Sequence, residues 1–294
     1  VALKHMFPEV PVNGGTFRPA RFTVPERSVL DARYPAACGG YLEVCGRVLD
    51  VVFGALAQAA PQRTPAASFG TTGVITVGGT HPGTHRYFVG VFPYPGGYGA
   101  YHGGDGLVHG TSPQSMANFM SIEMSEHRYP LRFGYFALRE DSGGAGQWRG
   151  GCGSTYRIEP WSDCTMSVLG DRVDHAPYGV AGGGPAAANR VEFSLAGEAF
   201  VPPLRSKWEK QPMHAGDAVI ACSPGGGGFG DALERPLEAV EADLNLGYVS
   251  RATAERDYGV VIAEATPHGT HMRYRLDADA SAARRRALAA ARPR

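Results

Sequence analysis

The 294-residue sequence has no net charge, because 28 lysine and arginine residues are balanced by 28 aspartate and glutamate residues. A nucleic-acid-binding surface or a polybasic membrane anchor needs an excess of basic side chains, so this balance argues against both. The sequence also has no apolar run near the roughly 18 residues of a bilayer-spanning helix, and no secretory leader at its start. We therefore expect neither a nucleic acid nor a membrane among its partners.

Cysteine is scarce as well. The sequence has five cysteines, an odd number, and contains no Cys-x-x-Cys pair. Because their spacing matches no zinc-binding motif, we interpret them as reduced thiols and expect a cytoplasmic protein. The first residue is Val1 rather than methionine, so we expect the sequence to be the later part of a longer polypeptide.

Glycine and proline, by contrast, are abundant, with 41 and 22 residues. The hydrophobic fraction of 43% is ordinary, so the composition indicates a globular protein rich in loops and not a disordered one. Short β-branched and aromatic runs bounded by glycine or proline predict strands. These runs lie near 72–77, 86–92, 128–139, 152–159, 164–170, 190–195 and 217–222.

The best helical pattern covers residues 39–59, where apolar residues recur every three or four positions. The predicted buried stripe consists of Leu42, Cys45, Leu49, Val52 and Leu56. Further apolar residues lie outside this stripe, so we expect a long helix that is buried on two sides.

Shorter helices are predicted after residue 236, after residue 250 and over 280–291. Together with the strands, they predict an α+β fold. We expect a β-rich core with long glycine-rich loops over 1–231, containing the long buried helix, and a helical C-terminal tail over 232–294.

Side chains with catalytic chemistry gather in one irregular, glycine-rich stretch over residues 96–118. Irregular segments of this kind often carry function, because a rigid scaffold presents them. We predict that Asp105 and His109 are catalytic, in general acid/base or substrate-orienting roles. Substrate-binding positions are predicted at Arg86, His102, Asn118 and Phe119.

An alternative for the same stretch is that His102, Asp105 and His109 bind one metal ion, since imidazole and carboxylate suit zinc, manganese or iron. Their spacing matches no standard motif, so we assign no metal site to this chain. Two further glycine runs cover 141–151 and 225–230, and the second of them could cradle phosphate through backbone N–H groups. The second lacks the Lys-Ser/Thr of a P-loop, so turns and packing are the favoured interpretation of both.

A series of short motifs runs through nearly the whole chain and resembles, in the same order, the hydantoinase B/oxoprolinase family. The motifs are PVNGGTFRP from residue 11, VLDVVFGALA from 48, YPLR from 129, DSGGAGQWRGG from 141, GGGP from 182, SPGGGGFGD from 223, ER from 234, GYVS from 247 and YGVV from 258. No single motif is decisive, but their common order makes the resemblance specific.

The resemblance implies an enzyme subunit, namely the C-terminal half of a B-type subunit. Members of the family act with a larger, ATP-binding A-type subunit, and together they open hydantoin or lactam rings through ATP activation of the substrate carbonyl. The resemblance places ATP and magnesium on that partner, and a divalent metal on the N-terminal half of the B-type subunit, which this chain lacks.

Two other functions stay open. Some relatives carboxylate ketones, and the apolar pair Phe119 and Met120 favours a ketone substrate. The chain could also be a non-catalytic assembly subunit, since the resemblance places the metal elsewhere. The expected substrate is therefore a small cyclic amide or a ketone.

Overall fold

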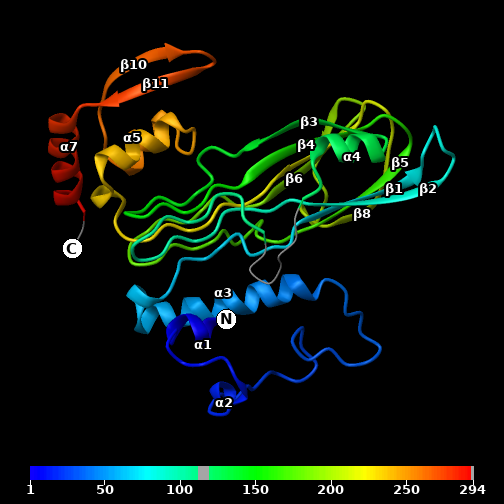
Figure 1. The fold of residues 1–294 in the computed structure, drawn as a ribbon, viewed down its shortest axis with the longest axis horizontal. Coiled ribbons are helices and arrows are strands. Elements are labelled where there is room, and N and C mark those ends of the chain that lie inside the picture. The colour runs from blue at the N-terminus through cyan, green and yellow to red at the C-terminus, as the bar shows by residue number, and fades with distance from the viewer. Residues whose placement is uncertain (112–118, 293–294) are drawn as a thin grey trace.

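The computed structural model describes residues 1–111 and 119–292. Helices and antiparallel sheets occur together, which confirms the predicted α+β class (Figure 1). One sheet has the strand order β2 (Tyr87–Pro93), β1 (Val74–Thr80), β5 (Cys164–Leu169), β8 (Trp208–Met213). The other has the order β3 (Leu131–Leu138), β4 (Ser154–Pro160), β9 (Ala218–Cys222), β6 (Arg190–Leu195), β7 (Glu198–Phe200).

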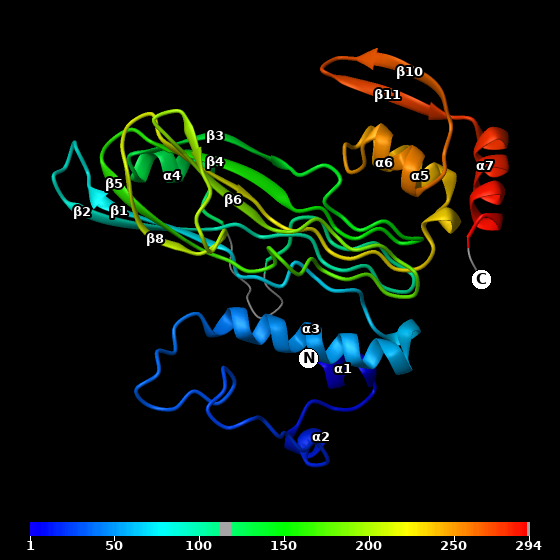
Figure 2. The same ribbon diagram turned by 180° about the vertical axis from the view of Figure 1, so that it is seen from behind.

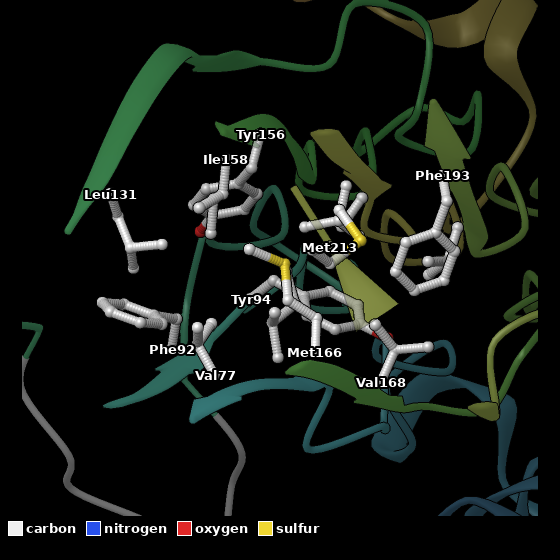
Figure 3. Packing of buried hydrophobic residues seen from close by; sticks show 14 of the residues in the cluster. Val77, Phe92, Tyr94, Leu131, Tyr156, Ile158, Met166, Val168, Phe193 and Met213 are labelled. Carbon is white, nitrogen blue, oxygen red and sulfur yellow. The ribbon is translucent and has the colours of Figure 1, made fainter. Parts of the chain in front are cut away.

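The two sheets pack face to face and enclose the main hydrophobic core (Figure 3). Alternate residues of β4 are buried, as expected for a strand with one face on a core. Aromatic, methionine and β-branched side chains from both sheets meet between them; the most completely buried include Val77, Tyr94, Ile158, Met166, Phe193 and Met213. The short helix α4 (Ile122–Arg128) contacts β3 at the edge of this sandwich.

Beyond the sandwich, four extended segments run side by side (Figures 1 and 2). We call them the glycine bundle; they cover residues 96–110, 142–153, 177–184 and 223–230. A strand in a sheet hydrogen-bonds to two neighbours, but the segment 223–230 bonds to more. Its N–H groups donate to the carbonyls of Gly151, Ala67 and Gly184, at distances of 2.9, 2.8 and 3.0 Å.

Glycine is required in this bundle because the backbones touch. A Cβ atom on Gly226 would lie 1.9 Å from the carbonyl oxygen of Tyr98, and one on Gly150 would lie 1.8 Å from that of Gly226. All residues of 223–230 are buried. The favoured packing interpretation of 141–151 and 225–230 is therefore confirmed, and much of the expected loop at 96–110 belongs to the same packed structure.

The long predicted helix is α3 (Tyr41–Ala59), but the prediction of its buried stripe is wrong. The buried residues are Glu43, Gly46, Asp50 and Phe53, while the predicted apolar stripe is half-buried or exposed. The carboxylate of Glu43 accepts a hydrogen bond from the backbone N–H of Thr72 at 2.6 Å. A Cβ on Gly46 would lie 2.5 Å from the carbonyl oxygen of Gly70, so the backbones approach closely here. Polar contacts and this close approach therefore determine which face of α3 is buried.

The N-terminal segment lies on the far side of α3 from the sandwich (Figure 1). It contains the short helices α1 (Ala2–Met6) and α2 (Gly14–Phe17), and α3 is followed by a 3-10 turn, Pro61–Arg63. Most side chains of residues 7–40 are exposed, including large hydrophobic ones such as Phe22 and Tyr34. This part of the chain therefore buries little apolar surface of its own.

The sequence had predicted a helical tail, but the tail also contains two strands. It contains a 3-10 turn (Ala232–Glu234), α5 (Leu237–Asn245), α6 (Arg251–Asp257) and α7 (Ala278–Ala290), and also a hairpin of β10 (Ile262–His268) and β11 (His271–Leu276). The hairpin strands are largely exposed, so they lack the apolar alternation that reveals a half-buried strand. Within residues 1–111 and 119–292, every helix is too short or too polar to cross a bilayer.

Candidate functional site

An apolar cavity of about 550 Å³ lies at the edge of the sandwich, between the edge strands β2 and β3. Its walls come from both sheets and from the segment that leads into α4. The lining residues are Ile75, Val91, Phe92, Pro93, Tyr94, Phe119, Met120, Ser121, Ile122, Glu123, Ser125, Tyr129, Phe133, Phe136, Tyr156 and Ile158. This volume falls in the range of ordinary small-molecule sites, roughly 300–1,000 Å³. We call it the aromatic cavity.

His109 lies against the wall of the aromatic cavity. Its ring centroid is 5.2 Å from that of Phe136, 6.0 Å from Phe119 and 6.3 Å from Tyr156, all three of which line the cavity. The residue adopts a left-handed backbone conformation with φ of 51°, held by a hydrogen bond from its N–H to the carbonyl of Cys152 at 2.9 Å. Strained backbone of this kind is frequent at functional sites.

The imidazole of His109 has an unused hydrogen-bonding atom. Its Nδ1 is buried and has no partner among the described residues. Burial also lowers the pKa of the imidazole below its usual value of 6.5, because desolvation disfavours the charged form. At neutral pH the ring is therefore a neutral group, able to accept one hydrogen bond and donate another.

This pKa shift can be checked by NMR. We expect the titration midpoint of His109 to lie below 6.5, and the stability that depends on neutral His109 to be retained above this pH and lost as the pH falls. The exposed His214 is an internal control: its Nδ1 lies 3.0 Å from a carboxylate oxygen of Asp163, which raises the pKa of that imidazole. If His109 titrates at or above His214, the assignment of a desolvated imidazole is wrong.

Tyr156 is a polar residue of the cavity lining that the sequence analysis missed. It lies on β4 and is 4% exposed, with its hydroxyl directed toward Leu131 and Phe92 (Figure 3). The hydroxyl oxygen has no hydrogen-bond partner of ordinary geometry among the described residues. Burial raises the pKa of this phenol, and the hydroxyl of Ser154 opposes the shift more weakly.

Asp105, which was predicted to be catalytic, has both carboxylate oxygens engaged by other residues of the chain. Both of its carboxylate oxygens accept hydrogen bonds from Arg235, at 2.7 Å each, and one also accepts from the backbone N–H of Arg149 at 2.7 Å. Burial raises the pKa of Asp105, but Arg235 outweighs it and the net pKa is below the usual value. The carboxylate is therefore a weak base that joins the glycine bundle to the tail, and this placement does not support a catalytic role.

The ion pairs continue into the tail. Asp243 lies 2.9 Å from Arg235 and 3.1 Å from Arg149, and the side chains of all three are at most 6% exposed. The ring of Tyr248 stacks under the guanidinium of Arg149, with 4.6 Å between the guanidinium carbon and the ring centroid. We call Asp105, Arg149, Arg235 and Asp243 the charge network.

The other predicted binding residues divide into two groups. Phe119 lines the aromatic cavity, as expected for a substrate contact. His102 packs against Trp148 with ring centroids 5.0 Å apart, and Arg86 is exposed in the turn between β1 and β2; neither lines the cavity. Asn118 lies outside the described residues, so its predicted role stays a prediction.

The alternative metal site is not supported by the geometry. Among residues 1–111 and 119–292, no group of three or more histidine, cysteine, aspartate or glutamate side chains could hold a metal ion. His102, Asp105 and His109 have instead three separate environments: an aromatic stack, the charge network and the cavity wall. All five cysteines are free thiols.

Comparison with known proteins places the chain in context. The family model for hydantoinase B/oxoprolinase matches residues 1–232. An uncharacterized protein of Methanocaldococcus jannaschii, MJ0963, is 35% identical over 87% of this chain and 44% of its own length. Caprolactamase subunit beta of Pseudomonas jessenii is 33% identical over 87% of this chain and 46% of its own length. The chain therefore spans less than half the length of these relatives.

Solved structures show the same relationship. The ATP-dependent caprolactamase from Pseudomonas jessenii superimposes with a TM-score of 0.79 at 28% identity, covering 97% of this chain and 50% of that chain. Acetone carboxylase, solved in a nucleotide-free state, superimposes with a TM-score of 0.62 at 25% identity, covering 80% of this chain and 35% of that chain. One of these structures is thus an ATP-dependent caprolactamase and the other an acetone carboxylase.

Proposed function

Because the chain belongs to the hydantoinase B/oxoprolinase family, we propose that it provides part of the substrate cavity of an ATP-dependent cyclic amidohydrolase. The enzyme would open a hydantoin or lactam ring, with ATP and magnesium bound by an A-type partner subunit. One observation carries the proposal: this chain has an apolar cavity of about 550 Å³, and the imidazole of His109, whose Nδ1 has no partner among the described residues, packs against three of its lining residues.

In this proposal the described residues bind and orient the substrate. The aromatic walls exclude water around the ring that is to be opened. Phe119 contacts the substrate, and His109 positions its polar edge or transfers a proton as a neutral imidazole. Asp105, held by Arg235, supports the glycine bundle and takes no proton. The divalent metal implied by the family is assigned to the N-terminal half of the B-type subunit.

That N-terminal half is also the proposed occupant of the exposed face of α3. Relatives are about twice as long as this chain, and α3 exposes Val48, Val51 and Val52 on the side away from its buried contacts. The neighbouring segment 7–40 exposes further large hydrophobic side chains. Apolar surface of this extent is typical of a protein–protein contact.

The partner surface can be tested by one substitution. Val51 is 71% exposed, so Val51→Asp should leave the chain folded, but it would bury a charge at the proposed contact. We expect association with a separately produced N-terminal half to weaken at least about tenfold in a binding titration. Val201→Asp, at another exposed valine, is the matched control; equal effects of the two substitutions would exclude this face as the contact.

The proposed function is tested by reconstitution. The chain is mixed with an A-type subunit and the N-terminal half, and ATP-dependent opening of a hydantoin or lactam is measured with and without it. We expect turnover only when all three polypeptides are present. Turnover that does not need this chain would establish the remaining alternative, a non-catalytic assembly subunit.

A ketone carboxylase is the second candidate, favoured by the similarity to acetone carboxylase and by the apolar cavity lining. The same mixture separates the two reactions, because fixation of labelled bicarbonate into a ketone would replace ring opening. Both reactions would use the cavity for a small carbonyl compound, and they differ in the bond that is made or broken.

A further inference from the structure

We infer that β2 is a docking edge, at which an extended segment of the N-terminal half of the B-type subunit adds a strand to the sheet. The inference rests on the proposed function, in which that half is a partner of this chain, and it assigns a second contact, made by backbone groups, to the same partner. It depends on three features of β2: its unpaired backbone groups, its exposed apolar side chains and a sequence that does not protect the edge.

The hydrogen bonds between β1 and β2 show which backbone groups of β2 are free. The N–H of Tyr94, just after β2, donates to the carbonyl of Gly73, just before β1, at 2.8 Å, and the register places these two residues opposite each other. In an antiparallel pair, residues bonded in this way alternate with residues whose N–H and C=O groups point away from the partner strand. The backbone groups of Tyr87, Val89 and Val91 therefore point outward, at the side where the described part of the sheet ends.

The other edges of the sandwich are protected. Natural edge strands carry charges or prolines, are short, or are covered, because an unpaired edge pairs readily with another strand. Within the described residues, β8 carries Glu209, Lys210 and Pro212, β7 has three residues, and on β3 the N–H of Phe133 donates to the carboxylate of Glu126 in α4 at 2.6 Å.

The edge strand β2 has none of these protections along its length. It has seven residues without a charge, its proline is the last of them, and it pairs with β1 over seven consecutive positions without a bulge. A long, regular and uncharged edge of this kind is a template for another strand. Such a sequence is therefore what we expect of a strand that is paired on both sides in the complete protein.

The side chains along the edge are apolar and open to solvent. Tyr87, Val89 and Val91 are 74%, 51% and 58% exposed, and aromatic and β-branched residues are those that pack best against a neighbouring strand. The hairpin of β1 and β2 projects from the end of the sandwich opposite the tail (Figures 1 and 2). A strand added at this edge would cover these side chains without displacing the tail.

The lengths of the relatives indicate the occupant. MJ0963 and caprolactamase subunit beta match this chain over only 44% and 46% of their own lengths, so more than half of each relative lies outside the match. A segment of the same polypeptide has an effective concentration in roughly the millimolar range, which a second copy of the chain does not reach in dilute solution. We expect the added segment to be extended, with apolar residues at alternate positions and no proline where its N–H groups face β2.

Amide hydrogen exchange of the full chain, resolved by residue with NMR, tests the inference. In the free chain, the N–H groups of Phe88 and Gly90 should be protected by β1, while those of Tyr87, Val89 and Val91 should exchange rapidly. When a separately produced N-terminal half is added, we expect exchange of the second group to slow at least about tenfold, with little change in the first. A contact made by side chains alone would not protect alternate amides.

A proline substitution tests the backbone contact directly. Val89→Pro removes one outward N–H and keeps the bonds to β1, because proline is tolerated at edge positions whose N–H does not pair within the sheet. We expect an unchanged circular dichroism spectrum, and binding of the N-terminal half at least about tenfold weaker. Val89→Thr keeps the N–H and the branched shape, so this matched control should change binding less than about threefold. Val91→Lys introduces the kind of charge that β8 carries and should also weaken binding about tenfold, which keeps the test open if the proline variant does not fold.

The possible failures are distinguishable. The inference is overturned if the N-terminal half does not bind, if it binds without protecting the three outward amides, or if Val89→Pro and Val91→Lys bind normally. Protection of the same amides when the chain alone is concentrated would identify a second copy as the occupant and would overturn the inference as well. A reconstituted mixture that opens a lactam while the edge stays unprotected would leave the proposed function intact. Conversely, a protected edge in a mixture that opens no ring would contradict the proposed function and leave the docking edge in place.

Discussion

Replacing Gly226 with alanine is expected to prevent the chain from reaching a stable fold. The added Cβ would lie 1.9 Å from the carbonyl oxygen of Tyr98 and 2.0 Å from its carbonyl carbon. These are backbone atoms in a segment that bonds to several neighbours, so they cannot move without breaking other hydrogen bonds. We expect a loss of at least about 3 kcal/mol in the free energy of unfolding, at or beyond the upper end of ordinary overpacking.

Urea denaturation followed by circular dichroism measures this loss. Gly184→Ala is the matched control within the same bundle, because its Cβ would meet no atom closer than 3.4 Å. We expect Gly184→Ala to change the unfolding free energy by less than about 1 kcal/mol. If Gly226→Ala unfolds at the same urea concentration as the control, the bundle is not packed as described and its glycines have another role.

Replacing Arg235 with methionine is expected to have the second-largest effect. Arg235 is 4% exposed and neutralises both Asp105 and Asp243. Without Arg235, the carboxylates of Asp105 and Asp243 face each other with only Arg149 between them. Removing one partner of a buried ion pair lowers the free energy of unfolding by about 3–5 kcal/mol. We expect the tail to detach first, because Asp105 and Arg149 belong to the glycine bundle while Arg235 and Asp243 belong to the tail.

Limited proteolysis with mass spectrometry would detect the detached tail, and denaturant titration would give the lost stability. The control is Arg205→Met, which removes an exposed pair with Asp174 and should cost less than about 1 kcal/mol. An Arg235→Met chain with unchanged stability and proteolysis would show that the network contributes no net stability.

The same network predicts a pH dependence. The net pKa of Asp105 is lowered by Arg235 despite burial, so the stabilisation is present above the pKa of an unfolded aspartate, roughly 3.9. It is lost as the pH falls through the lower, folded value. The wild-type chain should therefore lose stability below about pH 4, and Arg235→Met should lack this part of the acid transition.

Local patterns in the sequence were sufficient to predict most of the framework. Strands such as β1 and β2 were predicted from β-branched and aromatic runs, because a strand with one buried face needs that alternation. The helix α6 was predicted after residue 250, and the side chain of Ser250 caps it by accepting a hydrogen bond from the N–H of Thr253, at 3.2 Å. The hairpin β10–β11 was missed because its side chains are mostly exposed.

The candidate site was less predictable. His109 and Phe119 were singled out by residue type alone, and both lie at the aromatic cavity. Asp105 was singled out for the same reason, yet its partner Arg235 is 130 positions away. Tyr156 carried no signal, since a tyrosine in an alternating strand is usually a core residue.

By itself, the sequence determined the family, the order of most helices and strands, and the need for glycine at many positions, because these properties depend on neighbouring residues and on motif order. Only the tertiary structure decided which glycines touch, which face of α3 is buried, and that Asp105 is an ion-pair partner while Tyr156 and His109 adjoin one cavity. The physical reason is that backbone contact, burial and desolvation depend on groups far apart in the chain, whose distances exist only after folding.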